Sequence, residues 1–223
     1  MDDTIRNMII ASMVLVLASL YGGDTLGSWF HWERETANDD GDTSSSITEF
    51  YLEGYELEYE FDAGSDSGLE DEKEDYDSDY DDNDCSGNSD CDEIYDLMQG
   101  KIKNLMYILL LAGGVALYFL NDGDREKATL ACLAMGGAGL LAALLFVASF
   151  PEAMDDDLDI FDSTDGFDED PSIFGEDSQT TDEDNVYYGD NVDIDRSWRP
   201  GFALALVALS GILGMAAYYE LKQ

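Results

Sequence analysis

The stretch ATLACLAMGGAGLLAALLFVASF, residues 128–150, carries no charged side chain. A helix needs about 20 apolar residues to cross the roughly 30 Å hydrocarbon core of a bilayer. Residues 5–23, 102–120 and 200–219 are of similar length and are also predominantly apolar. One such stretch would fit a buried helix of a soluble protein, whereas four in a chain of 223 residues predict a membrane protein with four spanning helices.

Two of the three connections between these stretches are strongly acidic. The chain has a net charge of −41, and 45 of its 51 Asp and Glu residues lie in segments 24–101 and 151–199. The third connection, residues 121–127, is short and contains two basic residues. The acidic segments would repel nucleic acid and attract divalent cations or basic proteins, while the helices require a lipid bilayer.

The orientation of the helices follows from the basic residues near their ends. Each side of the membrane receives four Lys or Arg residues, so the count alone does not decide. Long loops translocate largely regardless of their charge, and the rule that basic residues stay inside is most reliable in short loops. Because Arg125 and Lys127 lie in the short turn, we expect a multi-pass protein of the cell membrane with both termini in the cytoplasm and both acidic loops outside.

The first apolar stretch allows two interpretations. MIIASMVLVLASLYGG, residues 8–23, has the apolar region and the small residues of a cleaved signal peptide. The preceding MDDTIRN is net negative, however, whereas signal peptides usually begin with positive charge. A retained helix is therefore the favoured interpretation, and cleavage would leave three spans.

Alternating side chains predict strands in both acidic loops. YELEYEF, residues 55–61, places aromatic and aliphatic residues on one face and glutamates on the other. Residues 28–32, 47–53 and 185–195 are further candidates, and we expect one small antiparallel sheet at the helix ends, built from both loops. The tracts 67–84 and 162–185 have too few apolar residues to fold alone, so we expect them to be disordered or ordered only by cations.

Two cysteines, Cys85 and Cys91, lie in the most acidic part of the first loop. An extracellular location favours a disulfide between them. The surrounding DNDCSGNSDCDE also approaches the spacing of a calcium-binding loop, with Gly87 at the sharp turn. Because 12 of the 23 residues in 71–93 are acidic, a diffuse atmosphere of cations explains the same pattern. The candidate calcium ligands are Asp82, Asp84, Ser86, Asp90 and Glu93.

No enzyme motif is apparent, and we expect a non-enzymatic protein. His31 is the single histidine, and there is no glycine-rich phosphate loop outside the apolar stretches. The glycines of 136–139, Gly113–Gly114 and the pair Ser210 and Gly214 fit close packing between helices. A dimer face is the alternative for these small residues.

The arrangement of segments resembles the claudin and peripheral-myelin-protein group of four-span proteins. The shared features are a long first loop with strands, the late cysteine pair, DEIYDLMQGKIKN before the second helix, the basic turn DREKA and the third helix ending FVASFPEAM. The resemblance implies a four-helix bundle with one outer β-sheet. We expect a role in adhesion, in assembly with copies of itself or another membrane protein, or as an accessory subunit. The alternative is an extracellular protein that binds or senses calcium or another divalent cation.

Overall fold

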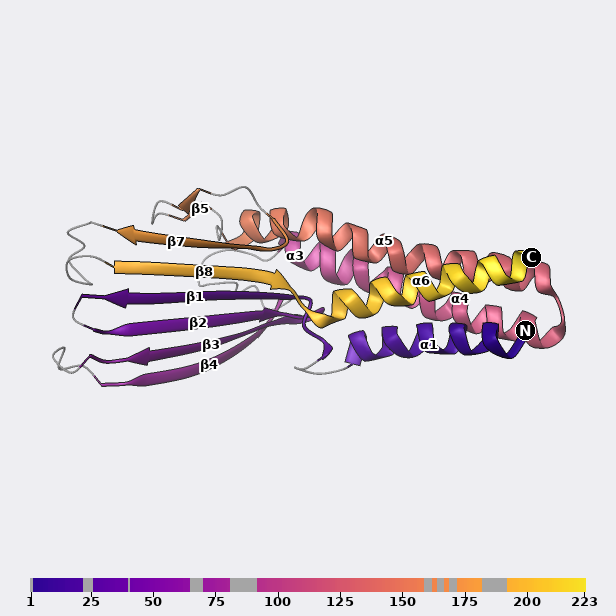
Figure 1. Cartoon of the computed structure of the whole chain (residues 1–223), viewed down its shortest axis with the longest axis horizontal. Coiled ribbons are helices and arrows are strands. Elements are labelled where there is room, and N and C mark those ends of the chain that lie inside the picture. The colour runs from indigo at the N-terminus through magenta and orange to yellow at the C-terminus, as the bar shows by residue number, and fades with distance from the viewer. Residues whose placement is uncertain are drawn as a thin grey trace.

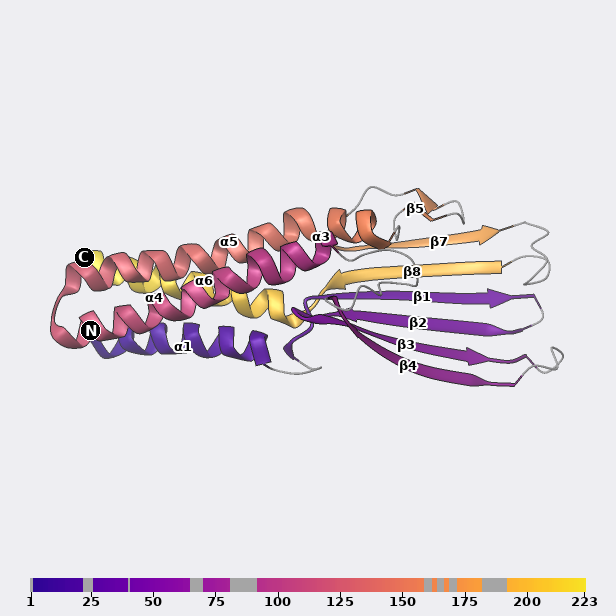
Figure 2. The same ribbon diagram turned by 180° about the vertical axis from the view of Figure 1, so that it is seen from behind.

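The computed structural model describes residues 2–21, 26–39, 41–64, 70–80, 92–158, 162–163, 167–168, 172–181 and 192–223. Helices form one end of the elongated molecule and a β-sheet forms the other (Figure 1). Both chain termini and the connection between α4 and α5 lie at the end away from the sheet, as the view from behind also shows (Figure 2).

Four helices are long and apolar enough to cross a membrane, as the sequence predicts. Two of them extend beyond their apolar stretches, because a short helix α3 and a π-helix η2 run directly into α4, and because α5 continues past Pro151. The turn between α4 and α5 uses Gly123, whose φ of 83° is readily available to glycine alone. The helices are α1 (Asp2–Tyr21), α3 (Asp92–Tyr95), η2 (Asp96–Ile102), α4 (Lys103–Asp122), α5 (Arg125–Leu158) and α6 (Phe202–Lys222).

Glycines bring α5 and α6 into backbone contact. A Cβ atom on Gly136 would lie 2.6 Å from the backbone nitrogen of Met215, and one on Gly139 would lie 2.8 Å from the Cα of Gly211. A Cβ on Gly137 would meet no atom within 4 Å. The prediction of internal helix packing is therefore confirmed for Gly136 and Gly139, whereas Gly137 faces away from the neighbouring helices.

The first helix is an integral part of the bundle. Buried residues recur along α1 every three or four positions, which places them on one face. Within that face the hydroxyl of Ser12 lies 2.8 Å from the hydroxyl of Ser210 on α6 and donates to the Ser210 carbonyl at 3.0 Å. Such hydrogen bonds between helices stabilise bundles in membranes modestly. The buried face of α1 consists of Ile5, Ile9, Ser12, Val16 and Ser19.

Strands from both acidic segments form a single six-stranded antiparallel sheet, as expected. Its order is β4-β3-β2-β1-β8-β7, and the pairing of β1 with β8 joins the first segment to the second. A separate two-stranded hairpin consists of β5 (Asp162–Ser163) and β6 (Phe167–Asp168). The six strands are β1 (Phe30–Asn38), β2 (Thr43–Phe50), β3 (Gly54–Asp62), β4 (Glu72–Asp79), β7 (Gly175–Thr181) and β8 (Val192–Pro200).

The expectation that the acidic tracts 67–84 and 162–185 lack structure is wrong for part of each. Strand β4 lies in the first tract, and β7 lies in the second. Neither strand has enough apolar residues to fold alone. The backbone of β4 forms hydrogen bonds with β3, and that of β7 with β8, and both partner strands are already held by the core. The remaining described part of the second tract includes the hairpin of β5 and β6.

An aromatic cluster fixes the sheet to the helix bundle. Phe146 and Phe150 of α5 stack with ring centroids 4.5 Å apart. Trp29 lies 5.1 Å from Phe146, while Phe30 and Phe50 lie 5.3 and 5.4 Å from Phe150. All five side chains are fully buried. Because aromatic side chains contribute large buried areas and favourable edge contacts, the start of the sheet is rigidly anchored on α5.

Candidate interaction surface on the six-stranded sheet

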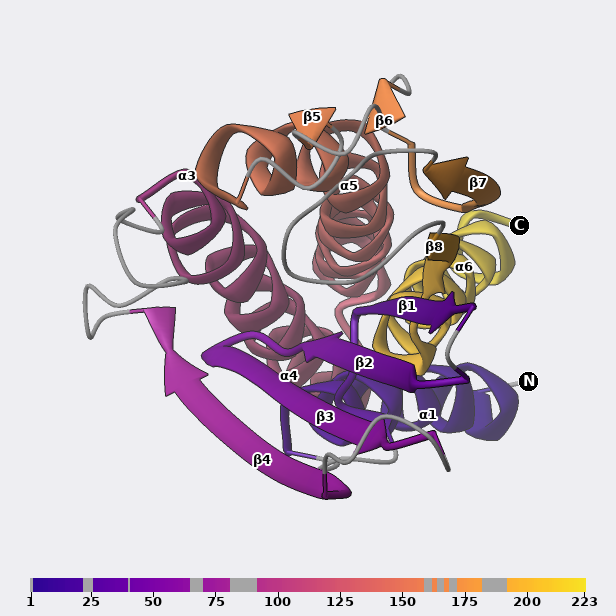
Figure 3. The ribbon, with the colours of Figure 1, turned by 90° about the vertical axis from the view of Figure 1, so that its left-hand side faces the viewer.

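The two faces of the sheet differ sharply in chemistry. Successive residues of a strand point to opposite faces, and the register aligns like residues across neighbouring strands. On one face Trp32 of β1 stacks on Trp198 of β8 at a centroid distance of 5.1 Å, and Phe50 of β2 lies 5.9 Å from Tyr55 of β3. We call this the aromatic face. Seen from the end of the sheet, the strands curve around one side of the helix ends (Figure 3).

The opposite face, which we call the acidic face, carries few apolar residues. Its cations are Lys73 and Arg199, and its histidine is His31. The Lys73 ammonium pairs with Glu58, which raises the pKa of the lysine. The carboxylates that the register places on the acidic face are Glu33, Glu35, Glu49, Glu56, Glu58, Glu60, Asp62, Asp75, Asp77, Glu176, Asp193 and Asp195.

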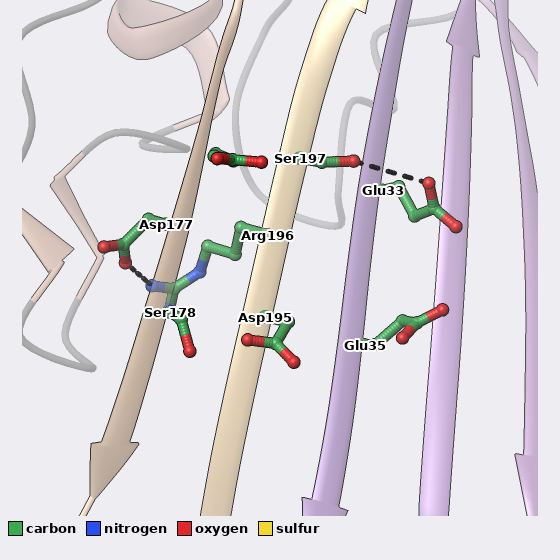
Figure 4. Close-up of a pocket in the computed structure, with 8 residues that line it drawn as sticks. Glu33, Glu35, Asp177, Ser178, Asp195, Arg196 and Ser197 are labelled. Carbon is green, nitrogen blue, oxygen red and sulfur yellow. Dashed lines mark hydrogen bonds and ion pairs between the residues drawn. The ribbon is translucent and has the colours of Figure 1, made fainter.

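A pocket of about 530 Å³ lies across β1, β8 and β7. Figure 4 shows the carboxylates of Glu33 and Glu35 on β1 beside Asp195 and Ser197 on β8. The Ser197 hydroxyl donates to the Glu33 carboxylate at 3.4 Å. Glu35 and Asp195 are directly opposite each other in the register. This concentration of negative charge and hydroxyl groups suits a cationic surface or ion. The complete lining is Glu33, Glu35, Glu176, Asp177, Ser178, Asp195, Arg196 and Ser197.

Arg196 differs from the other basic residues because it is buried. It lies on the aromatic face with 4% of its surface exposed, and its guanidinium reaches Asp177 of β7 at 3.5 Å (Figure 4). A buried charge is tolerated only when it is paired, so this contact helps to fix β7 on β8. Close by, the indole nitrogen of Trp198 donates to the hydroxyl of Ser172 at 3.2 Å.

Two tyrosines hold the turn between β2 and β3 at the base of the sheet. The Tyr51 hydroxyl donates to Glu49 at 2.7 Å and to Glu56 at 3.2 Å, so it lies between two carboxylates of the acidic face. The Tyr80 hydroxyl is buried and donates to the Tyr51 carbonyl at 2.9 Å. Burial is the main reason that the pKa of both phenols lies above the ordinary value, and the carboxylate of Glu49 raises that of Tyr51 further.

A buried carboxylate joins the two helical extensions beside the sheet. Asp157 near the end of α5 accepts hydrogen bonds from the backbone N–H groups of Ile94, at 2.8 Å, and Glu93, at 3.4 Å. These donors are at the start of α3 and have no partner within their own helix. Asp157 therefore caps the long helix that runs from α3 through η2 into α4, and it does so from a different helix.

The structure describes only one residue of the disulfide and the calcium site that the sequence predicts. Cys85 and Cys91 of the predicted disulfide lie outside the described residues, and so do the candidate calcium ligands Asp82, Asp84, Ser86 and Asp90. Glu93 is described, and its side chain is exposed in the first turn of α3. Within the part of the chain that the structure describes, no group of three or more His, Cys, Asp or Glu side chains is placed to hold a metal ion.

Sequence reasoning missed the acidic pocket, although the signal was available. WERE, residues 32–35, alternates around two glutamates, and DIDRSW, residues 193–198, alternates in the same way. Each run predicts a face of carboxylates, but their antiparallel pairing in the register of Glu33 with Ser197 is visible only in the structure.

Comparison with known proteins assigns the chain to no family. No protein-family model matches the chain, and no curated protein matches it either. The resemblance to the claudin group therefore rests on the order of helices, strands and loops alone.

Proposed function

We propose that this protein is a non-enzymatic, four-span protein of the cell membrane that presents the acidic face as a contact surface for adhesion or assembly. The partner is a basic surface of another membrane protein, or of a protein on a neighbouring cell. The acidic face of a second copy would repel it. Assembly between copies would therefore use another surface, such as the outward side of the helices.

The observation that carries the proposal is the rigid attachment of the acidic face to the helices. A disordered acidic loop loses conformational entropy when a partner binds, whereas the strands that carry these carboxylates are already ordered by β-pairing and by the aromatic cluster. The pairing of β1 with β8 also ties both acidic segments into one body. This construction supports a surface that is pre-formed for binding.

The proposed orientation places the sheet outside the cell and the termini in the cytoplasm. Both termini and the turn with Arg125 and Lys127 lie at the end of the bundle away from the sheet (Figure 1). The packing of α1 against α6 supports a retained first helix, since its removal would expose the hydroxyl of Ser210.

Labelling of single cysteines in intact cells tests this orientation. In a background with Cys85 and Cys91 replaced by serine and the buried Cys132 by alanine, Asp124→Cys should resist a membrane-impermeant maleimide and Ser178→Cys on β7 should react. After the cells are opened, both should react. Reaction of Asp124→Cys in intact cells together with protection of Ser178→Cys would show the opposite orientation.

Neutralising the acidic face tests the contact surface itself. Glu33→Gln/Glu35→Gln removes two charges from the acidic face of β1, and Glu72→Gln/Glu74→Gln removes two from the aromatic face of β4. After cross-linking on intact cells and native electrophoresis, the first variant should lose the high-mass species of the unmodified protein, and the second should keep it. Equal loss in both variants, or no high-mass species in the unmodified protein, would contradict the proposal.

The second candidate function is extracellular binding or sensing of divalent cations, and the density of carboxylates in residues 71–93 favours it. A specific calcium loop that includes Glu93 would bind one ion per chain and prefer calcium to magnesium. In calorimetry, Glu93→Gln should then weaken calcium binding far more than Glu72→Gln, which removes the same charge. If both variants lose calcium equally, the cations form only a diffuse atmosphere.

A further inference from the structure

Strand β4 is one of the two edge strands of the sheet, and acidic residues on it lie opposite acidic residues of its neighbour β3. The register pairs Asp77 with Glu56 and Asp75 with Glu58, and all four carboxylates are on the acidic face. Like charges directly opposite each other on neighbouring strands destabilise the pairing. Lys73 is the single cation of β4, and its ion pair with Glu58 offsets only part of this repulsion.

Buried groups hold β4 at one end only, and at its far end the Asp71 carboxylate accepts an exposed hydrogen bond from the Ala63 N–H at 3.0 Å. Beyond its end near the membrane, the Tyr80 N–H donates to the Glu53 carbonyl at 3.1 Å, and the buried Tyr80 hydroxyl donates to the Tyr51 carbonyl. Along the strand itself, Tyr76 is 48% exposed, and the other described side chains up to Asp77 are exposed as well. Little apolar burial therefore holds the far end of β4, where Glu72 is opposite Phe61.

We propose that β4 is a salt-dependent strand, which pairs with β3 at high ionic strength and detaches from its far end at low ionic strength. Detachment would expose the backbone edge of β3 and the half-buried side chains of Leu57, Tyr59 and Phe61. The rest of the sheet would stay paired, because β1 and β8 carry buried Trp32 and Trp198. The proposal does not depend on the proposed contact function.

The distance between the opposed carboxylates of β3 and β4 determines the salt concentration at which their repulsion is screened. Opposed side chains on neighbouring strands lie about 5 Å apart. The Debye length is about 10 Å at 0.1 M and about 3 Å at 1 M. Distant carboxylates are therefore screened at moderate salt, but the opposed pairs are relieved only near molar salt. Pairing of β4 should keep increasing well above physiological ionic strength.

Hydrogen exchange of the protein in lipid nanodiscs tests the proposal. Peptides that cover residues 72–79 should exchange faster at about 0.05 M salt than at about 1 M, and peptides of β1 provide the reference within the same molecule. Asp75→Asn/Asp77→Asn should slow the exchange of β4 at low salt by roughly threefold to tenfold, because it removes both opposed pairs. The matched control, Glu72→Gln/Glu74→Gln, removes the same charge from the aromatic face.

The control separates local repulsion from total charge. If the opposed pairs govern the strand, the control should slow exchange clearly less than Asp75→Asn/Asp77→Asn at low salt, and the two variants should converge at high salt. Exchange of β4 that does not depend on salt relative to β1 would overturn the proposal. Equal effects of the two variants would also overturn it, since net charge alone would then account for the result.

Discussion

The contact between α5 and α6 gives the sharpest test of the bundle, because two glycines only two residues apart should respond in opposite ways. Gly139→Ala places a methyl group 2.8 Å from the Cα of Gly211, whereas contacts of real Cβ atoms ordinarily begin at 3.4 Å. The helices must therefore separate by roughly 0.6 Å, and backbone atoms cannot rotate away as a side chain can. Overpacking of this kind costs about 1–3 kcal/mol.

Gly137→Ala makes the same chemical change on the same helix. Its methyl group would meet nothing within 4 Å, and alanine favours a helix over glycine by up to about 1 kcal/mol. This variant should be as stable as the unmodified protein or slightly more stable. Both variants gain the same helix propensity, so their free energies of unfolding should differ by the cost of overpacking alone, about 1–3 kcal/mol.

Unfolding by sodium dodecyl sulfate in mixed micelles, followed by far-ultraviolet circular dichroism, measures this difference. Equal destabilisation by Gly137→Ala and Gly139→Ala would refute the packing of α5 on α6. Cross-linking in membranes tests the alternative that the small residues form a dimer face between two copies of the protein. If Gly137→Ala leaves the free energy of unfolding unchanged but abolishes a cross-linked dimer, Gly137 belongs to an interface between copies.

Three further predictions concern the half of the molecule that contains the sheet. Asp157→Ala should lower the free energy of unfolding by about 1 kcal/mol, because it removes the oxygens that cap α3, whereas Asp156→Ala at an exposed position should change it little; thermal melts in detergent measure both. Because the pKa of Tyr80 is raised by burial, the unfolded chain loses this phenolic proton above about pH 10 while the folded chain keeps it. Stability should therefore be complete below that pH and fall above it, and Tyr80→Phe should remove this part of the alkaline loss in denaturant titrations at several pH values. Cys85 and Cys91 should form a disulfide, which mass spectrometry of unreduced peptides would show as a linked pair rather than two free thiols.

The sequence predicts four long apolar helices well because apolar length is a strong signal, but it ends the third helix too early, at residue 150 rather than at Leu158. Residues 151–158 contain four acids, which is typical of a loop. In the structure they continue α5, because Met154 is buried in the core and Asp157 caps α3. A carboxylate that caps a different helix leaves no local pattern in the sequence.

The sequence also predicts some strands and misses others, because a strand can depend on its neighbour for stability. Alternation identifies β3 in YELEYEF, since every second residue is apolar. EKEDYDSD of β4 has Tyr76 alone as an apolar residue, so its composition favours disorder. The strand forms because β3 offers it a row of backbone partners, which is a property of the neighbour and not of the segment itself.

Stability within the sheet should decrease from the strands that join the two acidic segments outward to β4. Trp32, Ile194 and Trp198 of β1 and β8 are buried, whereas most of β4 is exposed. Regions with few buried apolar contacts open most readily in folded proteins. The carboxylates of Glu33 and Glu35 therefore lie on the most stable strands, whereas Asp75 and Asp77, each opposite a glutamate of β3, lie on the strand that the core holds least. This arrangement allows a high charge on the outer surface while the pocket across β1 and β8 keeps its shape.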